Sequence, residues 1–207
     1  MATDITLTVI ASILCGTGCG MMNVASLGMD AIGTLYDGIR TSFGLSLDSI
    51  GTVSMGINIV LIVFLLIVRR KYVSIGTLIY LLIYGILANL STSLLQRFFE
   101  SSPVWVHAVI GVLGIAVLTL GLGIYIAVDI GVDPFTGVTL LITEITHKKL
   151  QYVKIAMDVV TMTAGILLHA RIGALTVMSV LLEGPLIAFF TKQVQLLYFR
   201  KLYRKRS

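Results

Sequence analysis

The chain has 207 residues, of which 57% are hydrophobic and 12% are charged, with a net charge of +5 and a mean hydropathy of +1.01. A soluble domain carries about twice that share of charged residues, so the composition excludes an ordinary soluble domain. It leaves no room for a sizeable soluble domain beside a membrane domain.

Apolar runs of about 20 residues recur along the chain, and this is the length that an α-helix needs to cross the hydrocarbon core of a bilayer. The run INIVLIVFLLIV at 57–68 does not alternate apolar and polar residues, as a strand of a membrane β-barrel would. The sequence therefore predicts an all-α, polytopic transmembrane helical bundle. It forms a single membrane domain over 1–191, followed by a basic cytoplasmic tail over 192–207. We expect six spans, at residues 5–27, 50–68, 72–95, 104–128, 153–169 and 172–191.

Two segments between the spans are too polar to face lipid throughout. The first, at residues 29–48, holds three acids and an arginine, and the second, at 133–150, holds two acids and two lysines. We expect each to form an additional interfacial or re-entrant helix, because broken helices at membrane depth are tolerated where they line a cavity. If both segments crossed instead, each half of the chain would contain four spans.

Lys and Arg are distributed unevenly between the two sides of this six-span arrangement. Of the 15, 12 lie on the side of the chain ends, and only Arg40, Arg97 and Arg171 lie on the other. Because cytoplasmic loops carry the excess of such residues, we expect a multi-pass protein of the cell inner (cytoplasmic) membrane with both termini cytoplasmic. The basic tail is typical of an anchor to lipid headgroups, and we expect no nucleic-acid partner.

The chain contains an internal repeat with an offset of 103 residues. Three glycines and an aspartate recur in one register: Gly18, Gly20, Gly28 and Asp30, matched by Gly121, Gly123, Gly131 and Asp133. The repeats cover about 5–95 and 104–191, and in their last spans Tyr84-Gly85 matches Glu183-Gly184. With three spans each, an odd number, the halves must run in opposite directions, which makes an inverted repeat. With four spans each, the repeats would be parallel.

Polar side chains inside apolar spans are costly and usually face a cavity or a partner. Our candidate substrate-binding residues are the polar side chains within or at the ends of the predicted spans, together with the two repeat aspartates, Asp30 and Asp133. The full set is Asn23, Asp30, Asn58, Tyr84, Asp129, Asp133, Asp158 and Glu183. We expect Asn58, Asp158 and Glu183 to face the interior. The last two are extra acids of the second half, which suits a proton or cation coupled to a shared site, and we expect binding to depend on pH through one of them. The alternative is that they only satisfy backbone donors or Arg171, the nearest cation.

Asp30 and Asp133 each follow a glycine by two residues and open a helical stretch, with Pro134 in the first helical position of the second. This is the pattern of an N-cap, whose side chain accepts a hydrogen bond from an N–H two or three residues on. We expect both residues to cap their helices. A helix N-terminus of this kind also suits a polar or anionic substrate group.

No arrangement typical of catalysis or of metal binding is present in the sequence. It has no metal-ligand spacing, no nucleophile paired with a base, and no glycine-rich phosphate loop that follows a strand. Cys15 and Cys19 lie four apart on one helical face, where a disulfide is geometrically poor, so we expect buried packing residues. We therefore expect no enzyme, no cofactor and no bound metal.

The second half carries the pattern G-x-G-(x)7-G-x-D at 121–133, then Ile-Gly-Ala-Leu at 172–175 and Glu-Gly-Pro-Leu-Ile at 183–187. Over most of the chain these motifs resemble the YczE/YitT-like family of bacterial integral membrane proteins. One departure is that Asp133 directly precedes Pro134, so the acidic position of the family is not matched cleanly. The resemblance implies the helical fold and the bacterial inner membrane rather than a substrate.

Three functions remain open from the sequence. The leading interpretation is a small-molecule permease in the lipid bilayer, with a polar site for its substrate between the two repeats. The first alternative is a substrate-binding membrane subunit that depends on an energising subunit. The second is a non-transporting accessory protein. The sequence leaves open whether the chain forms a homo-oligomer.

Overall fold

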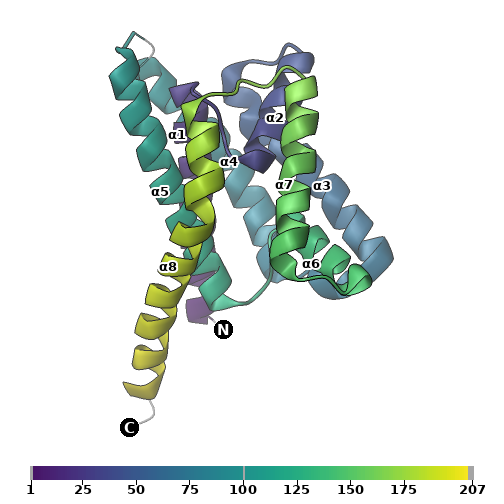
Figure 1. The fold of residues 1–207 in the computed structure, drawn as a ribbon. Helices are drawn as coiled ribbons and strands as arrows, with labels where there is room; N and C mark the ends of the chain where they lie inside the picture. Colours follow the sequence, from purple (N-terminus) through teal and green to yellow (C-terminus); the bar gives the residue numbers. More distant parts are fainter. Residues whose placement is uncertain (1, 100, 205–207) are drawn as a thin grey trace.

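The computed structural model, drawn in Figure 1, describes residues 2–99 and 101–204. Within these ranges every regular element is helical and no strand is present. The α-helices in chain order are α1 (Ala2–Ala25), α2 (Ala31–Ser42), α3 (Ile50–Arg69), α4 (Ile75–Phe99), α5 (Val104–Val128), α6 (Pro134–Thr146), α7 (Leu150–Leu167) and α8 (Ala174–Arg204). Short 3₁₀ turns at Leu47–Ser49 and Arg70–Tyr72 flank α3.

Six of these helices are long and apolar enough to cross a membrane, which confirms the predicted polytopic bundle. The candidate spans are Thr3–Ala25, Leu47–Tyr72, Ile75–Phe99, Val104–Val128, Leu150–Leu167 and Ala174–Leu197. The other two helices, α2 and α6, have 12 and 13 residues. At 1.5 Å per residue they are about 18–20 Å long, too short for a hydrocarbon core of about 30 Å. They lie within the two polar segments, 29–48 and 133–150, for which the sequence predicts interfacial or re-entrant helices.

Figure 1 shows how these helices are arranged. The N-terminus lies at the end of the bundle towards which α8 runs, and we call this end of the bundle the near end. The opposite end is called the far end. The short helix α2 lies towards the far end and α6 towards the near end.

The centre of the bundle is formed by α1 and α5, which pack against each other in opposite directions. Gly18 of α1 lies against Gly114 of α5, and Ala11, earlier in α1, lies against Gly121, later in α5. At Gly18 and at Gly121 a Cβ would collide with the backbone of the partner helix. Small residues therefore allow the closest approach of the two helices here, as is common in membrane proteins.

The long helices α4 and α8 pack directly against this pair. The last helix of each half packs against the first, α4 on α1 and α8 on α5. The short helices reach across the halves: α2 packs chiefly against α7, and α6 packs against α3 as well as α7. One contact differs between the halves. Whereas α3 packs along α4, α7 and α8 are not a packed pair within the part of the chain that is described.

At the far end, Asp37 ties α2 to the connection between α7 and α8. Its carboxylate is fully buried and accepts hydrogen bonds of 2.7 Å from Arg171 Nη2, 2.8 Å from the Arg171 backbone N–H and 2.9 Å from Arg40 Nη2. Arg171 also donates to the Asn23 side chain of α1 over 2.7 Å. Burial by itself would raise the pKa of Asp37, but the hydrogen bonds and charge of Arg171, with Arg40, hold it below its usual value.

At the near end, Glu144 ties α6 to the turn between α3 and α4. Its Oε2 accepts a hydrogen bond of 2.6 Å from the Tyr72 hydroxyl and lies 2.8 Å from Lys71 Nζ. The hydrogen bond from Lys71 is the main cause that lowers the pKa of Glu144. Each short helix is therefore held by a carboxylate to a connection in the other half of the chain.

The two helix starts differ in capping. Asp133 caps α6 as predicted, because its Oδ1 accepts a hydrogen bond of 3.0 Å from the Thr136 N–H, and Pro134 fills the first helical position. The same prediction is wrong for Asp30, whose side chain accepts no capping hydrogen bond in α2. Its carboxylate lies beside Gly33 without the geometry of a cap, while the Thr34 N–H and hydroxyl both bond to the Asp30 carbonyl, at 2.7 and 2.8 Å.

We predict that Asp37→Asn lowers the thermal stability of the purified protein in detergent, since two arginines lose their buried counter-charge. Removing one member of a buried pair costs about 3–5 kcal/mol, and the partly exposed Arg171 side chain puts this case near the lower limit. Because the pKa of Asp37 is lowered by folding, its contribution is complete above the unfolded pKa of about 4 and is lost as the pH falls through the folded value.

The matched control is Asp48→Asn, which removes an exposed carboxylate from the connection between α2 and α3. Thermal unfolding should be compared for both variants and the wild type between about pH 3 and 7, a range that brackets the unfolded pKa. Equal losses in the two variants, or a stability difference between Asp37→Asn and wild type that does not shrink in acid, would contradict this role.

We also predict that Asp133→Ala destabilises the protein by about 1 kcal/mol, the usual cost of losing an N-cap, and that Asp133→Ser restores most of it. Thermal unfolding in detergent measures both. Asp30→Ala should lose less capping energy, because the Asp30 carboxylate lies near the Gly33 backbone but makes no capping hydrogen bond of full geometry. If Asp133→Ser is as unstable as Asp133→Ala, the carboxylate has a role other than capping.

Candidate substrate site between the two halves

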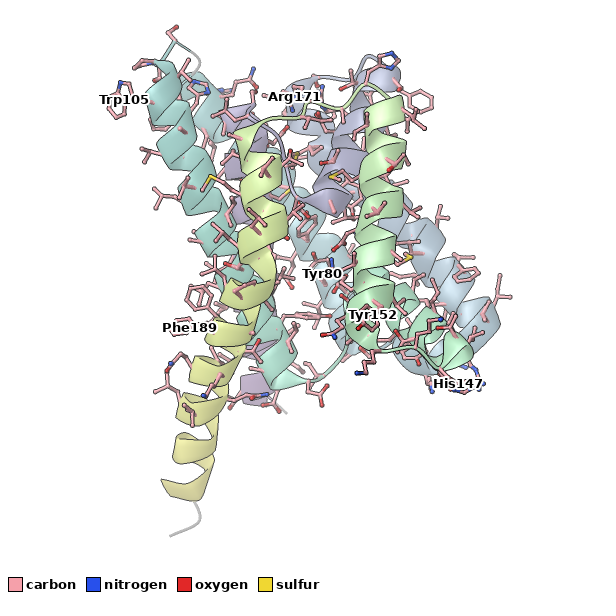
Figure 2. All side chains as sticks on the ribbon, viewed as in Figure 1. Tyr80, Trp105, His147, Tyr152, Arg171 and Phe189 are labelled. Atoms are coloured by element: carbon pink, nitrogen blue, oxygen red, sulfur yellow. The ribbon has the colours of Figure 1, made fainter. Side chains whose placement is uncertain are left out.

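Four buried tyrosines gather in the centre of the bundle. Tyr80, labelled in Figure 2, stacks on Tyr84 with ring centroids 4.9 Å apart, and the tilted ring of Tyr125 lies 5.4 Å away. The Tyr36 hydroxyl of α2 points at the Asn58 side-chain oxygen, 3.5 Å away. A buried tyrosine usually finds a partner for its hydroxyl. The Tyr125 hydroxyl makes no hydrogen bond of full geometry among the described residues and lies beside the Thr77 hydroxyl, so this cluster has hydrogen-bonding capacity to spare.

One face of α8 presents further buried polar atoms. The Thr176 Oγ1, the Ser179 Oγ and the Glu183 Oε1 are each buried and make no hydrogen bond of full geometry in the described part of the chain, although the Ser179 hydroxyl lies close enough to the Glu183 carboxyl to interact with it. Their spacings of three and four residues place them on one side of the helix. Ser179 is fully buried and lies one turn from Glu183. Buried polar atoms nearly always have a partner, so this face is suited to a bound ligand or water.

Several charged groups lie close to this face. Asp30, at the start of α2, is 8% exposed. The charges of Asp30, Lys154 and Asp158 are near enough to Glu183 to act on it electrostatically. Carboxyl groups from the start of α2, from α7 and from α8 therefore share one region of the bundle.

Asp158 does not stand alone in this region, because it forms an ion pair with Lys154, one turn earlier in α7. Taking Arg171 as its nearest cation is therefore wrong, since that residue is engaged at the far end. The side chains of Lys154 and Asp158 remain 45% and 29% exposed, so Asp158 is less enclosed than predicted. The Lys154 Nζ lies 5.4 Å from the ring centroid of Phe135, the second residue of α6, which brings the pair close to the start of that helix.

Two candidates do not join this region. The Asn23 amide is fully buried, but it donates to the Leu47 carbonyl over 2.8 Å and to the Thr92 hydroxyl over 3.2 Å, and it accepts from Arg171. Its hydrogen bonds hold helices together and leave little capacity for a substrate. Asp129 is an exposed residue in left-handed conformation at the end of α5, so its place inside a span was wrongly predicted.

The other candidates lie in or beside this region, together with residues that the sequence did not single out. Asn58 is 2% exposed and Tyr84 is 4% exposed. The additional residues are Tyr36, Tyr80, Tyr125, Lys154 and Ser179. Two of them had a local signal, since Tyr80 and Lys154 lie one helical turn before Tyr84 and Asp158. The others have ordinary sequence surroundings.

What the region offers is aromatic faces, hydroxyl groups and carboxyl groups. Cys15 and Cys19 of α1 are free and buried. Within residues 2–99 and 101–204, no group of three or more His, Cys, Asp and Glu side chains is arranged to hold a metal ion. Such a set of side chains is suited to binding a polar or charged organic molecule.

Comparison with known proteins agrees with this architecture. The model of DUF6198, described as a family of unknown function, matches residues 2–192. The chain is 24% identical over 175 residues to the uncharacterized membrane protein YczE of Bacillus subtilis (strain 168), which covers 84% of this chain and 79% of that protein. No solved structure matches. The resemblance to YczE-like proteins is thus confirmed, and this multi-pass membrane protein belongs to the DUF6198 family.

Proposed function

We propose that the protein is a small-molecule transporter with its substrate site between two inverted repeats. The observation that carries the proposal is a set of buried polar atoms that make no hydrogen bond of full geometry within residues 2–99 and 101–204, on α5 and α8, with Asp133 and Asp30 at the starts of the short helices close by. Substrate sites of transporters are typically formed near the bilayer midplane by such interrupted helices. The residues that we assign to the site are Asp30, Asn58, Tyr84, Asp133, Asp158 and Glu183, with Ser179, Tyr80 and Tyr125.

The contacts between α1 and α5 support the inverted relation. Residues 15 and 118 differ by the repeat offset of 103, and the Cys15 Sγ lies 3.8 Å from the Leu118 carbonyl oxygen. A residue contacts its own equivalent where a two-fold axis passes between the two. Adding the same offset of 103 to residues 18 and 11 gives residues 121 and 114. The contact of Gly18 with Gly114 is therefore the repeat equivalent of the contact of Gly121 with Ala11. Because α1 and α5 are antiparallel, a two-fold axis that relates them is perpendicular to both helices. If the two helices span the membrane, this axis lies in the membrane plane.

The starts of α4 and α8 give independent support. The Thr77 hydroxyl at the start of α4 donates to the Val132 carbonyl in the connection between α5 and α6, over 2.7 Å. At the start of α8, the Leu175 N–H donates to the Leu27 carbonyl between α1 and α2, over 3.0 Å. Each half therefore supports the backbone break of the other half, as a two-fold relation requires.

The same proposal sets the orientation. The near end, where the chain begins, carries Lys71 and Lys148, and the far end carries Arg40 and Arg171. By the positive-inside rule the near end is cytoplasmic, in the cell inner membrane. The second candidate function, a subunit that needs an energising partner, is favoured only if the pure protein binds a substrate without moving it.

We predict that the pure protein, reconstituted in liposomes, carries a substrate without another subunit. Amino acids, amines and vitamins should first be screened by thermal shift, because a ligand that binds the native state stabilises it. Those that raise the melting temperature are then tested for flux into the liposomes. Thermal stabilisation without flux would favour the binding subunit, and flux restored by a co-purified ATPase would establish it.

We further predict that binding of the transported compound depends on pH between about 5 and 8 through Glu183. An ionised carboxylate attracts a cation and a protonated one does not, so affinity for a cationic substrate should rise with pH. Glu183→Gln should flatten the curve, while Asp158→Asn, which removes a carboxylate already paired with Lys154, should flatten it less. Superimposable curves for all three proteins would remove both acids from the transport mechanism.

A further inference from the structure

Tyr84-Gly85 of α4 matches Glu183-Gly184 of α8 with an offset of 99 residues, four fewer than the offset of 103 earlier in the repeat, and the two glycines have different surroundings. A Cβ on Gly85 would collide with Met55 of α3, because α3 and α4 are in direct contact there. Asn89 strengthens that contact by accepting a hydrogen bond of 2.6 Å from the Gly51 N–H. A Cβ on Gly184 would meet no atom within 4 Å. Because α7 and α8 are also not a packed pair in the described part of the chain, the seam that is closed between α3 and α4 is open between α7 and α8.

This open seam, bordered by Gly184 on α8 and by Lys154 and Asp158 on α7, has a polar lining and an apolar surround. Gly184 follows Glu183 directly, and the charged pair of α7 acts on Glu183 electrostatically. In Figure 2 Tyr80 is seen between the two helices. The outward residues of both helices are apolar, with Val160 63% exposed and Val180 58% exposed. Lipid chains therefore reach the edge of a polar region.

The charges at the seam are unbalanced. Asp30, Asp158 and Glu183 supply three carboxyl groups, and Lys154 supplies one ammonium group. Ionised carboxyls next to hydrocarbon are costly unless paired, so when Asp30 and Glu183 are ionised one further cation would stabilise this region. The Ser179 hydroxyl is fully buried, makes no hydrogen bond of full geometry among the described residues, and lies beside the Glu183 carboxyl, so these two groups form one polar pair at the seam. The tyrosine faces behind it also attract cations.

We propose that the open seam admits a cationic amphiphile sideways from the bilayer. Its amine head binds Glu183 and Ser179 in front of the tyrosines, and its alkyl chain stays between α7 and α8. This names the substrate class of the transporter proposed above and rests on that function. A fully hydrophilic substrate has no use for a side opening, and an anionic head would meet the excess of carboxyl groups.

The test uses the protein in phosphatidylcholine nanodiscs and a dodecylamine probe with a photoreactive diazirine at the end of its chain. After illumination, the labelled residues are mapped by mass spectrometry. Labels should concentrate on α7 and α8 beside the seam, and unlabelled dodecylamine should compete. Dodecanol, which lacks the charge, and butylamine, which lacks the chain, should each compete at least about tenfold more weakly, a difference of about 1.4 kcal/mol.

Two glycine variants provide a matched pair. Gly184→Leu fills the seam at a position with free space, so the fold should be intact and the labelling should fall about tenfold. Gly56→Leu on α3, where a Cβ also meets no atom within 4 Å, should leave it unchanged. Glu183→Gln should reduce the preference for dodecylamine over dodecanol.

Three outcomes would overturn the proposal: full labelling of Gly184→Leu, labels spread evenly over all lipid-facing helices, or butylamine that competes as well as dodecylamine. The last would reject the side route and leave the transporter proposal intact. Labelling confined to the seam, with no flux of dodecylamine in liposomes, would instead reject transport and retain the seam as a binding site. The two failures are therefore distinguishable.

Discussion

Backbone that leaves a helix within hydrocarbon must find its hydrogen bonds inside the protein, and the rest of this structure depends on that constraint. The chain breaks its helices twice, between α1 and α2 and between α5 and α6. Each break is covered by the other half, through the Leu175 N–H on the Leu27 carbonyl and the Thr77 hydroxyl on the Val132 carbonyl. Because α1 and α5 pack in opposite directions, the two breaks follow opposite ends of this pair. The site that we propose lies between these two breaks.

The halves share this frame but differ in chemistry. In the first half, the seam between α3 and α4 is closed by glycine contacts and by the Asn89 side chain, and the face of α4 carries the stacked tyrosines. In the second half the equivalent face of α8 carries Ser179 and Glu183, and α7 stands apart from it. Polar atoms without partners are confined largely to this half, at Tyr125 and along α8. This asymmetry is the reason that we propose the second half as the binding side.

Local features could be predicted from the sequence. Six spans followed from the length and hydropathy of the apolar runs, the two short helices from their charges, and the Asp133 cap from its place before Pro134. Asp30 has the same pattern but does not cap, because local spacing does not determine how a carboxylate turns once it is buried. The Asp37–Arg171 pair joins residues 134 positions apart, and only tertiary packing brings them together. The open seam was equally invisible, since Gly85 and Gly184 are alike in sequence and differ only in what stands opposite.

The central claim is that the two short helices enter the membrane from opposite sides without crossing it. Substituted-cysteine accessibility tests this most directly, with Phe43→Cys after α2 and Lys148→Cys after α6, both exposed positions, in a background with Cys15 and Cys19 replaced by alanine. Intact cells and inverted membrane vesicles are treated with a membrane-impermeant maleimide. The account predicts labelling of Phe43→Cys only in intact cells and of Lys148→Cys only in inverted vesicles. Labelling of both positions from the same side would contradict it.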